Sequence, residues 1–577
     1  MKRISALLMM AAALLGAATY PENSMKDKLD PNASPQAVVG GTIVEHLGPS
    51  PKSLNYYLDA NSMSARVFGS LYESLITINS ANLEYDRCIA EKWTISDDRM
   101  TFTFWIDPNA RWSDGHPITA EDVVWTYQAI VDPKNMTGPH KLSLERVHPP
   151  EIVDGGRAVR FVAKEVHWNN LGAVGDFPIL PKHVFGKMDF NKINFEFPVV
   201  SGPCRIREFK EGVSLTLERR PDWWRIGWPS VKGSSNFERT VCRFYSDRDN
   251  SFDAFLKGEI DMYPVYTASQ WHQVEKKYKA VRNNWIVRKA VYNQAPIGFQ
   301  GFAMNMRRSP FDDVRVRKAM AHLLDRRTMN RTLMYGQYFL HRSYMEDLYD
   351  AEHPCPNVLV EYDPEAARRL LAEAGWRANP KSGILEKNGR PFEFTFLSRD
   401  GTSDKFLSIF QQALKDVGIR MNIQNKDWSA WAKDMDCFNF DMTWAAWGAG
   451  LYKNPEPMWS SGEADREGGS NLCGFRNAEV DALIEKQKGI FNVAERHEIC
   501  RKIDHIVFEQ HPYVLLWNSN HTRLLYWNKF GTPEKVLGKY SREDTTYWWY
   551  DEDLAAELQE AMRENLPLPQ QPPVVRW

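Results

Sequence analysis

Residues of the right types for chemistry occur along the chain, but their spacing builds no catalytic or cofactor site. The sequence lacks G-x-S-x-G, H-E-x-x-H and G-x-x-x-x-G-K, which excludes the usual serine nucleophile, zinc-protease helix and phosphate loop. Asp247 to Ser251 looks like the start of a calcium loop, but Phe252 stands where that loop needs Gly, and Gly258 replaces its final acid. The histidines lack metal-ligand spacing. We therefore expect no catalytic residue, no metal and no cofactor.

A run of Trp and Gly residues at 444–451 is better suited to binding than to catalysis. Gly448 and Gly450 have no Cβ, so the backbone of a ligand can approach and form main-chain hydrogen bonds. Trp444 and Trp447 can pack against ligand side chains, although core packing explains each of them equally well.

Helices and strands alternate through roughly 310–450, around this run, and predict a mostly parallel α/β lobe. Asp312 or Asp313 can cap one helix, and Asp363 followed by Pro364 can begin the next.

The part of the chain before residue 300 is richer in strands and turns. Residues 42–47 read as a buried strand. Residues 100–106 alternate as a strand does, with Met100, Phe102, Phe104 and Ile106 on one face. Thr119 is a predicted N-cap, and the apolar spacing over 61–75 predicts a helix.

Composition limits the class of protein. A chain of 577 residues needs two or three domains. With 43% hydrophobic and 25% charged residues, its composition is that of an ordinary globular protein. The net charge of −2 gives no indication of nucleic-acid binding.

The N-terminus has the pattern of an export signal. Lys2 and Arg3 precede an apolar run from Ile4 to Leu15, which is too short to span a bilayer and is followed by small residues. We expect residues 1–18 to be a cleaved signal peptide and 19–38 a flexible leader. Because no Cys lies near the cleavage site, we expect no lipid anchor.

The seven cysteines include no C-x-x-C pair, which argues against zinc and thioredoxin-like chemistry. An exported protein can form disulfides, and Cys204 and Cys242 lie in neighbouring strand-like segments. A bridge between them and two buried free thiols remain equal alternatives.

An ordered series of motifs resembles the extracellular solute-binding proteins of the peptide, opine and nickel class, called family five. The most specific stretch is Trp112 to Val123, WSDGHPITAEDV. Further matching stretches are Leu180–Val184, Leu256–Asp261, Pro310–Arg317 and Asp363–Trp376. Within the family the chain looks most similar to Yej-type oligopeptide and microcin C-binding proteins, through Phe440–Met442, Met458–Ser461, Gly469–Asn471, Tyr526–Phe530 and Tyr547–Asp551. Residues 342–356 do not resemble that group.

The resemblance implies a two-lobed α/β fold, the large periplasmic-binding-protein type with an extra subdomain. Lobe I would span 39–300, with the subdomain at about 75–195. Lobe II would span 301–517, a return to lobe I 518–560, and a Pro-rich tail 561–577. A ligand would bind between the lobes, which close by hinge motion.

The resemblance also suggests site residues. The run Trp444, Trp447, Gly448, Ala449 and Gly450 would lie beside the ligand backbone, with His46, Gly48 and Ser50 as the matching wall of lobe I. Many peptide binders of the family carry an Asp for the ligand amine where this chain has Gly450. A buried ammonium needs a countercharge or several hydrogen bonds. Asp427 is the acid we assign, with Asp434, Glu45 and Glu73 left open.

The function implied is that of the substrate-binding protein of an ABC importer, not an enzyme. It would be a periplasmic monomer that delivers oligopeptides or peptide-like solutes to a membrane permease. An oligosaccharide binder of the same fold and an exported peptide hydrolase are the alternatives.

Overall fold

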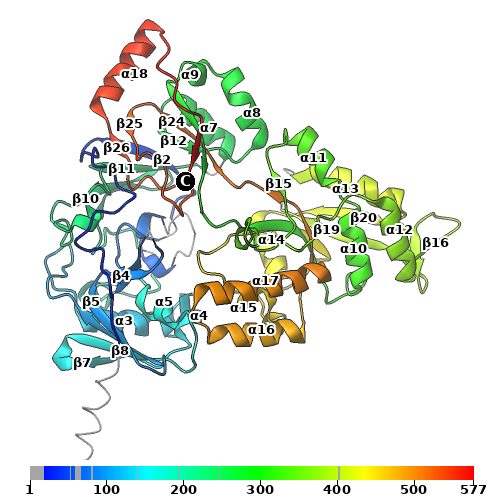
Figure 1. Ribbon diagram of the computed structural model, residues 1–577, viewed down its shortest axis with the longest axis horizontal. Coiled ribbons are helices and arrows are strands. Elements are labelled where there is room, and N and C mark those ends of the chain that lie inside the picture. The colour runs from blue at the N-terminus through cyan, green and yellow to red at the C-terminus, as the bar shows by residue number, and fades with distance from the viewer. Residues whose placement is uncertain are drawn as a thin grey trace, which may run out of the picture. The chain divides into compact units, whose positions relative to one another are not determined.

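The computed structural model describes residues 18–51, 53–58, 66–79, 82–137, 140–192, 194–245, 247–399 and 403–577. The chain forms two compact α/β units, coloured by sequence in Figure 1. Unit 1 combines the chain up to Tyr266 with Val274–Asn293 and Thr522–Trp577, and unit 2 combines Thr267–Gln273 with Gln294–His521. The structure thus divides the chain near 293 and 521, where the sequence analysis placed lobe boundaries at 300 and 517. The two-lobed α/β fold is confirmed.

The main sheet of unit 1 has eight strands in the order β27-β13-β24-β12-β2-β11-β10-β9. Its central strand β2 (Thr42–Gly48) runs parallel to both neighbours, β11 (Arg239–Phe244) and β12 (Met262–Pro264). The other strands are β9 (Cys204–Lys210), β10 (Ser214–Arg219), β13 (Ile286–Tyr292), β24 (Thr522–Trp527) and β27 (Val574–Arg576). Because β24 and β27 are C-terminal, the chain returns to unit 1 and its Pro-rich end pairs with β13.

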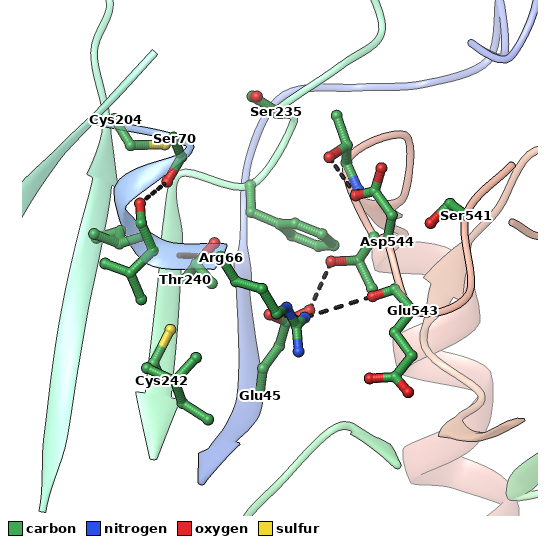
Figure 2. Close-up of a pocket in the computed structure, with 16 residues that line it drawn as sticks. Glu45, Arg66, Ser70, Cys204, Ser235, Thr240, Cys242, Ser541, Glu543 and Asp544 are labelled. Atoms are coloured by element: carbon green, nitrogen blue, oxygen red, sulfur yellow. Dashed lines mark hydrogen bonds and ion pairs between the residues drawn. The ribbon is translucent and has the colours of Figure 1, made fainter. Parts of the chain in front are cut away.

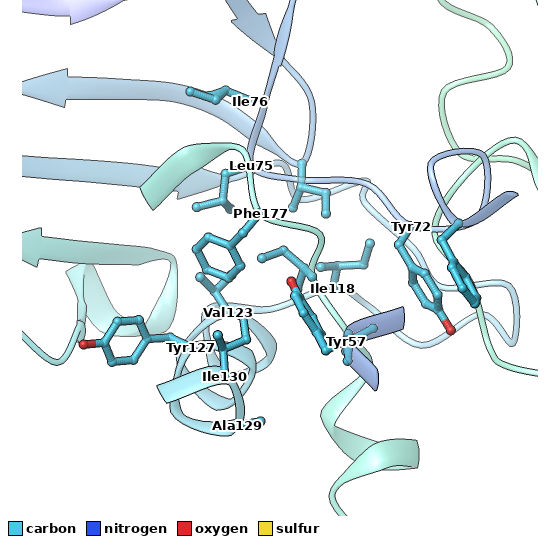
Figure 3. Packing of buried hydrophobic residues seen from close by; sticks show 14 of the residues in the cluster. Tyr57, Tyr72, Leu75, Ile76, Ile118, Val123, Tyr127, Ala129, Ile130 and Phe177 are labelled. Carbon is cyan, nitrogen blue, oxygen red and sulfur yellow. The ribbon is translucent and has the colours of Figure 1, made fainter. Parts of the chain in front are cut away.

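A second sheet of unit 1 has the order β1-β5-β6-β8-β7. Its strands are β1 (Ala18–Tyr20), β5 (Ala90–Ile95), β6 (Thr101–Ile106), β7 (Glu151–Val153) and β8 (Ala158–Val162). In β6 the alternate residues Phe102, Phe104 and Ile106 are buried, as the sequence predicted. Helix α3 (Ala120–Val131) begins at the predicted cap Thr119 and packs its apolar side into the core shown in Figure 3.

The predicted flexible leader is instead tied to unit 1. Residues 1–17 lie outside the described residues, and Ala18 opens β1, which pairs with β5. Tyr20 stacks on Trp93, and the carboxylate of Asp86 accepts hydrogen bonds from Ser24 Oγ at 2.8 Å and Met25 N at 2.6 Å. The side chains of Asp86 and Trp93 therefore hold this segment in place, although its polar composition predicted flexibility.

The helix predicted over 61–75 is wrong beyond residue 68. Residues 59–65 lie outside the described residues, and 66–68 are helical, but the chain then turns. The carbonyl of Leu71 accepts from Ser201 N and Gly202 N, and that of Ser70 accepts from Cys204 N. These tertiary hydrogen bonds take the place of the hydrogen bonds that a helix would form. The apolar residues of this segment are buried in the core although the segment is not helical after residue 68.

Unit 2 is built on a five-stranded sheet in the order β20-β19-β21-β14-β22. Its strands are β14 (Phe299–Met304), β19 (Glu393–Ser398), β20 (Arg420–Asn425), β21 (Met442–Trp447) and β22 (Tyr513–Leu515). Strand β19 is parallel to β20 and β21, but β14 is antiparallel to β21 and β22. The expectation of a mostly parallel lobe is therefore wrong for half of the strand pairs. Strands β14 and β22 come from the two ends of this part of the sequence, and β14 pairs antiparallel with both β21 and β22.

Two helices of unit 2 begin where the sequence predicted. Asp313 caps α10 (Val314–His322), and Asp363 caps α12 (Pro364–Glu373) by accepting from Ala366 N at 2.9 Å. Further helices are α11 (Arg326–Leu333), α13 (Asp404–Asp416), α14 (Trp428–Asp436), α16 (Ala478–Lys488) and α17 (Val493–Gln510), the last two drawn orange in Figure 1. Among the described residues, no helix has both the length and the apolar character that crossing a membrane requires.

The suggested bridge between Cys204 and Cys242 is wrong, since both are free. Strand β10 separates them: Cys204 lies opposite Arg219 on one side of β10, and Cys242 lies opposite Leu215 on the other. Two strand spacings, roughly 9–10 Å, exceed the reach of a disulfide.

Candidate functional site

The two tryptophans of the predicted binding run are held by the cores of unit 2. Trp444 donates from Nε1 to Gln300 Oε1 at 3.0 Å and packs edge-on against Phe302. Trp447 donates from Nε1 to Tyr513 Oη at 3.1 Å. Each indole is half-buried, so core packing accounts for most of its surface and only its remaining part can meet a ligand.

The chain after β21 leaves its main chain open. Gly448 and Gly450 are exposed and Ala449 is half-buried. A Cβ added to Gly448 would meet nothing within 4 Å. The main chain at this strand end is therefore accessible to a partner, which is what binding through backbone hydrogen bonds requires.

An ion pair lies beside Gly450. The ammonium of Lys453 donates to the carbonyl oxygen of Gly450 at 3.0 Å and pairs with Asp347 at 2.6 Å. The family resemblance implied an acidic side chain here; Gly450 has no side chain, and its carbonyl oxygen already accepts from Lys453. A ligand amine needs its countercharge from elsewhere.

The acid assigned from sequence, Asp427, is exposed and caps α14 by accepting from Ala430 N at 3.0 Å. Asp434, on the same helix, pairs with Lys426, whose hydrogen bond holds the pKa of this carboxyl below its usual value. Both acids therefore have local structural partners.

Glu73 is buried in unit 1 and serves the fold. Its carboxylate accepts from Arg225 at 3.0 Å and from Trp224 Nε1 at 2.8 Å. Such a buried, paired carboxylate has little capacity left for a ligand.

Glu45, the fourth acid left open, lines a pocket of about 400 Å³ within unit 1, shown in Figure 2. The pocket lies against the face of the main sheet formed by β2, β10 and β11. Its other walls come from residues 66–70 and from the loop before α18 (Glu552–Glu564). The loop residues that line it are Ser541, Glu543, Asp544, Thr545 and Thr546.

Three acids, Glu45, Glu543 and Asp544, and one guanidinium, that of Arg66, line the pocket. The carboxylate of Glu543 accepts from Tyr266 Oη, and that of Asp544 accepts from Thr546 N. Glu45 accepts from Thr545 Oγ1 at 2.6 Å, and Arg66 reaches Glu45 only at 3.4 Å (Figure 2). Burial alone would lower the pKa of Arg66, but the carboxylates of Glu45 and Glu543 outweigh it and raise the pKa. The excess of negative charge suits a cationic group, while Arg66 offers a partner for a carboxylate.

Burial raises the pKa of the Cys242 thiol to about 12, so this thiol lines the pocket as a neutral group.

The three predicted wall residues of unit 1 lie at the end of β2. His46 points to the opposite face from Glu45, and its Nε2 lies 3.0 Å from the carbonyl oxygen of Tyr245. Burial lowers the pKa of His46, which favours the neutral imidazole. Gly48 has a φ of +77°, a turn conformation that favours glycine. Ser50 Oγ is buried and has no partner among the described residues.

Sequence reasoning missed most of this pocket. Arg66 and the residues from Ser541 to Thr546 lie far apart in the chain, and no local pattern joins them. The only available signal was the expected return of residues 518–560 to lobe I, which did not single out any residue.

Known proteins are similar to this chain over most of its length. The sequence profile of the bacterial extracellular solute-binding proteins, family 5 middle, matches residues 84–469. The probable peptide-binding protein YejA of Agrobacterium fabrum is 27% identical over 558 residues, 89% of this chain and 90% of the relative. The peptidoglycan-binding protein YepA of the same organism is 27% identical over 571 residues, 90% and 92% of the two chains.

Solved structures share the fold. AppA from Bacillus subtilis, in complex with a nonapeptide, matches with a TM-score of 0.71 and 23% identity, covering 89% of this chain and 100% of that one. DppA from Helicobacter pylori, in complex with the peptide STSA, matches with a TM-score of 0.73 and 19% identity, covering 89% and 99%. The resemblance inferred from the motifs is confirmed, and the chain belongs to family 5 of the bacterial extracellular solute-binding proteins.

Proposed function

We propose that this solute-binding protein captures oligopeptides or peptide-like solutes and delivers them to the permease of an ABC importer, without catalysing a reaction. The observation that carries the proposal is similarity over about nine-tenths of both chains to a probable peptide-binding protein. A periplasmic or extracellular location follows from the family, and a monomer, a cleaved signal peptide and the absence of a lipid anchor remain predictions.

The geometry of the two units supports a peptide. The exposed main chain at 448–450 of unit 2 can form hydrogen bonds with a ligand backbone, and such bonds do not depend on the ligand's side chains. The pocket of unit 1 can hold an ammonium group by its carboxylates, which replaces the acid missing at Gly450. Glu45 thus takes the role first assigned to Asp427, and binding between the two units remains a prediction.

Isothermal titration calorimetry with a panel of tri- to pentapeptides, each free and N-acetylated, tests the proposal. We expect binding in the micromolar range, roughly −8 kcal/mol, for free peptides. The Glu45→Gln variant should weaken binding of the free peptide and leave the acetylated one unchanged. Asp427→Asn, which alters an exposed acid of unit 2, is the matched control and should bind as the wild type does.

Two results are distinguishable. No heat with any peptide, together with no co-purified peptide in native mass spectrometry, contradicts the peptide function. Equal binding of free and acetylated peptides contradicts only the amine role of Glu45. Cello-oligosaccharides should not raise the melting temperature, since the similar proteins named above are described as binders of peptides or peptidoglycan.

A second candidate ligand is a peptide derived from the cell wall. The 27% identity to the peptidoglycan-binding protein YepA over 571 residues favours it. Such stem peptides carry several ammonium and carboxylate groups, which Glu45 and Arg66 can pair with. Tighter binding of a purified stem peptide than of a standard peptide of equal length would select this candidate.

A further inference from the structure

Three side chains that commonly bind metal ions meet on unit 1, and none of them lines the pocket of Glu45. Asp114 and His116 come from the turn after Trp112, and His183 comes from the short helix α6 (Lys182–Phe185). One ligand atom from each lies within 4.8 Å of the others. His116 and His183 are far apart in the sequence, so no spacing pattern indicated a metal site, and the sequence predicted none.

The carboxylate of Asp114 lies between the two imidazoles. Its Oδ2 is 2.6 Å from His183 Nε2 and 3.1 Å from His116 Nδ1. The two rings stack with centroids 4.3 Å apart. The other oxygen, Oδ1, accepts from His116 N at 3.1 Å and so fixes the carboxylate with Oδ2 turned towards the rings.

Both backbone segments that carry these side chains are firmly held. Trp112 is buried and its N–H donates to the carbonyl of His116 at 2.9 Å, which closes the turn. Gly115 has a φ of +87°, which the turn requires. The first turn of α6 is fixed by Asp122, whose Oδ1 accepts from Lys182 N at 2.9 Å. The three ligand groups are therefore brought together by the fold, not by loose side chains.

We propose that Asp114, His116 and His183 form a binding site for a divalent transition-metal ion of the zinc type. Two imidazoles and one carboxylate are a ligand set that zinc accepts at about 2.0–2.2 Å, with a fourth position left for water. A tetrahedral site of this size separates ligand atoms by roughly 3.3 Å, so the 2.6 and 3.1 Å contacts need only small side-chain rotations.

The nitrogen ligands also select the ion. Imidazoles favour Zn²⁺, Cu²⁺ and Ni²⁺, whereas Mg²⁺ and Ca²⁺ require oxygen ligands. The side chain of His116 is 61% exposed, and those of Asp114 and His183 are 29% and 28% exposed, so an ion can enter from solvent. Binding would tie the turn at 112–116 to α6. The competing explanation is a carboxylate shared by two imidazoles without an ion.

Calorimetric titration of ZnCl₂ into the full-length, untagged, chelator-treated protein separates these explanations. We expect one equivalent of Zn²⁺ to bind, and Co²⁺ to give visible absorption bands of a site with nitrogen and oxygen ligands. His116→Ala and His183→Ala should each weaken Zn²⁺ binding by more than the roughly 10–100-fold that the loss of an outer partner costs. His353→Ala, which removes a histidine beside Asp350 in unit 2, is the matched control and should bind Zn²⁺ unchanged.

Circular dichroism checks that the variants fold. If His183→Ala fails to fold, His116→Ala decides the outcome, because its side chain is the most exposed of the three. A wild-type protein that takes up no Zn²⁺, or a folded His116→Ala variant that binds it as tightly as the wild type, overturns the proposal. The titration contains no peptide, so its result is independent of the peptide-binding function.

Discussion

At the scale of single residues, buried charges in unit 1 divide into those that hold the fold and those open to a pocket. Glu73 and Glu45 are both buried acids, 7% and 8% exposed, and sequence alone could not separate them. Their partners do: Glu73 faces the buried guanidinium of Arg225, whereas Glu45 faces a pocket.

The Glu73→Gln variant should therefore lose stability without losing ligand affinity. It removes the carboxylate that pairs directly with the buried Arg225, and breaking such a buried pair typically costs about 3–5 kcal/mol. Urea denaturation measures the loss, and Glu121→Gln, which breaks the exposed pair with Lys182, should unfold as the wild type does. A Glu73→Gln protein of normal stability that binds peptide poorly would make Glu73 the ligand acid instead.

Asp504 gives a pH-dependent prediction. Its carboxylate accepts from Tyr344 N at 2.7 Å, Tyr349 Oη at 2.8 Å and Asn357 Nδ2 at 3.0 Å, and so holds the segment 342–356 that departs from the family pattern. Burial raises the pKa of Asp504 from 3.8 to about 6 in the folded protein.

A raised pKa means that the folded state binds more protons than the unfolded state between about pH 4 and 6. The contribution of Asp504 to the free energy of unfolding is therefore largest below about pH 4. It falls by about 3 kcal/mol as the pH rises from about 4 to 6. The Asp504→Asn variant should lack this slope when unfolding free energies are measured from pH 4 to 7. Glu534→Gln, at an exposed acid, should keep it; an unchanged slope in Asp504→Asn would contradict the assignment.

At the scale of elements, two glycines lie at the end of β21, one closely packed and one with open space around it. A Cβ on Gly298 would lie 1.9 Å from the carbonyl oxygen of Trp447, whereas a Cβ on Gly448 would meet nothing within 4 Å. Gly298 thus allows the chain before β14 to approach β21 closely, and Gly448 leaves the strand end open.

These surroundings predict different results for two alanine substitutions. Gly298→Ala should displace the end of β21 and lower both the melting temperature and the peptide affinity. Gly448→Ala should change the unfolding free energy by less than about 0.5 kcal/mol. It should still weaken peptide binding, because its methyl group occupies the space of the ligand backbone. A Gly448→Ala variant with wild-type affinity would remove this strand end from the proposed site.

Local elements were predictable because their signals are local. Thr119, Asp313 and Asp363 cap helices through hydrogen bonds within three residues, and the alternation in β6 reflects one buried face. The order of strands was not predictable in this way. The insertion of β10 between β9 and β11 disproved the disulfide, and the antiparallel entry of β14 made the sheet of unit 2 mixed.

At the scale of the whole molecule, the motif series predicted the family and the two-lobed fold, but not the pocket. Glu45, Arg66 and Glu543 come together only because the C-terminal segment returns to unit 1 beside β2. A single sequence carries no record of such long-range contacts, so Glu45 could not be chosen over Glu73 or Asp427 until the fold was known.

Hydrogen–deuterium exchange measured with and without peptide tests whether one ligand engages both units. A ligand at 100 times its Kd stabilises the bound state by about 2.7 kcal/mol, enough to slow exchange of amides that open locally. We expect slower exchange at 448–451 in unit 2 and at 541–546 in unit 1, because the proposed contacts lie in both. An N-acetylated peptide should lose protection at 541–546 first, since it lacks the ammonium group for which the carboxylates of the pocket are proposed. Protection confined to one unit would instead mean that the ligand is held there alone, and that the other unit takes no part in capture.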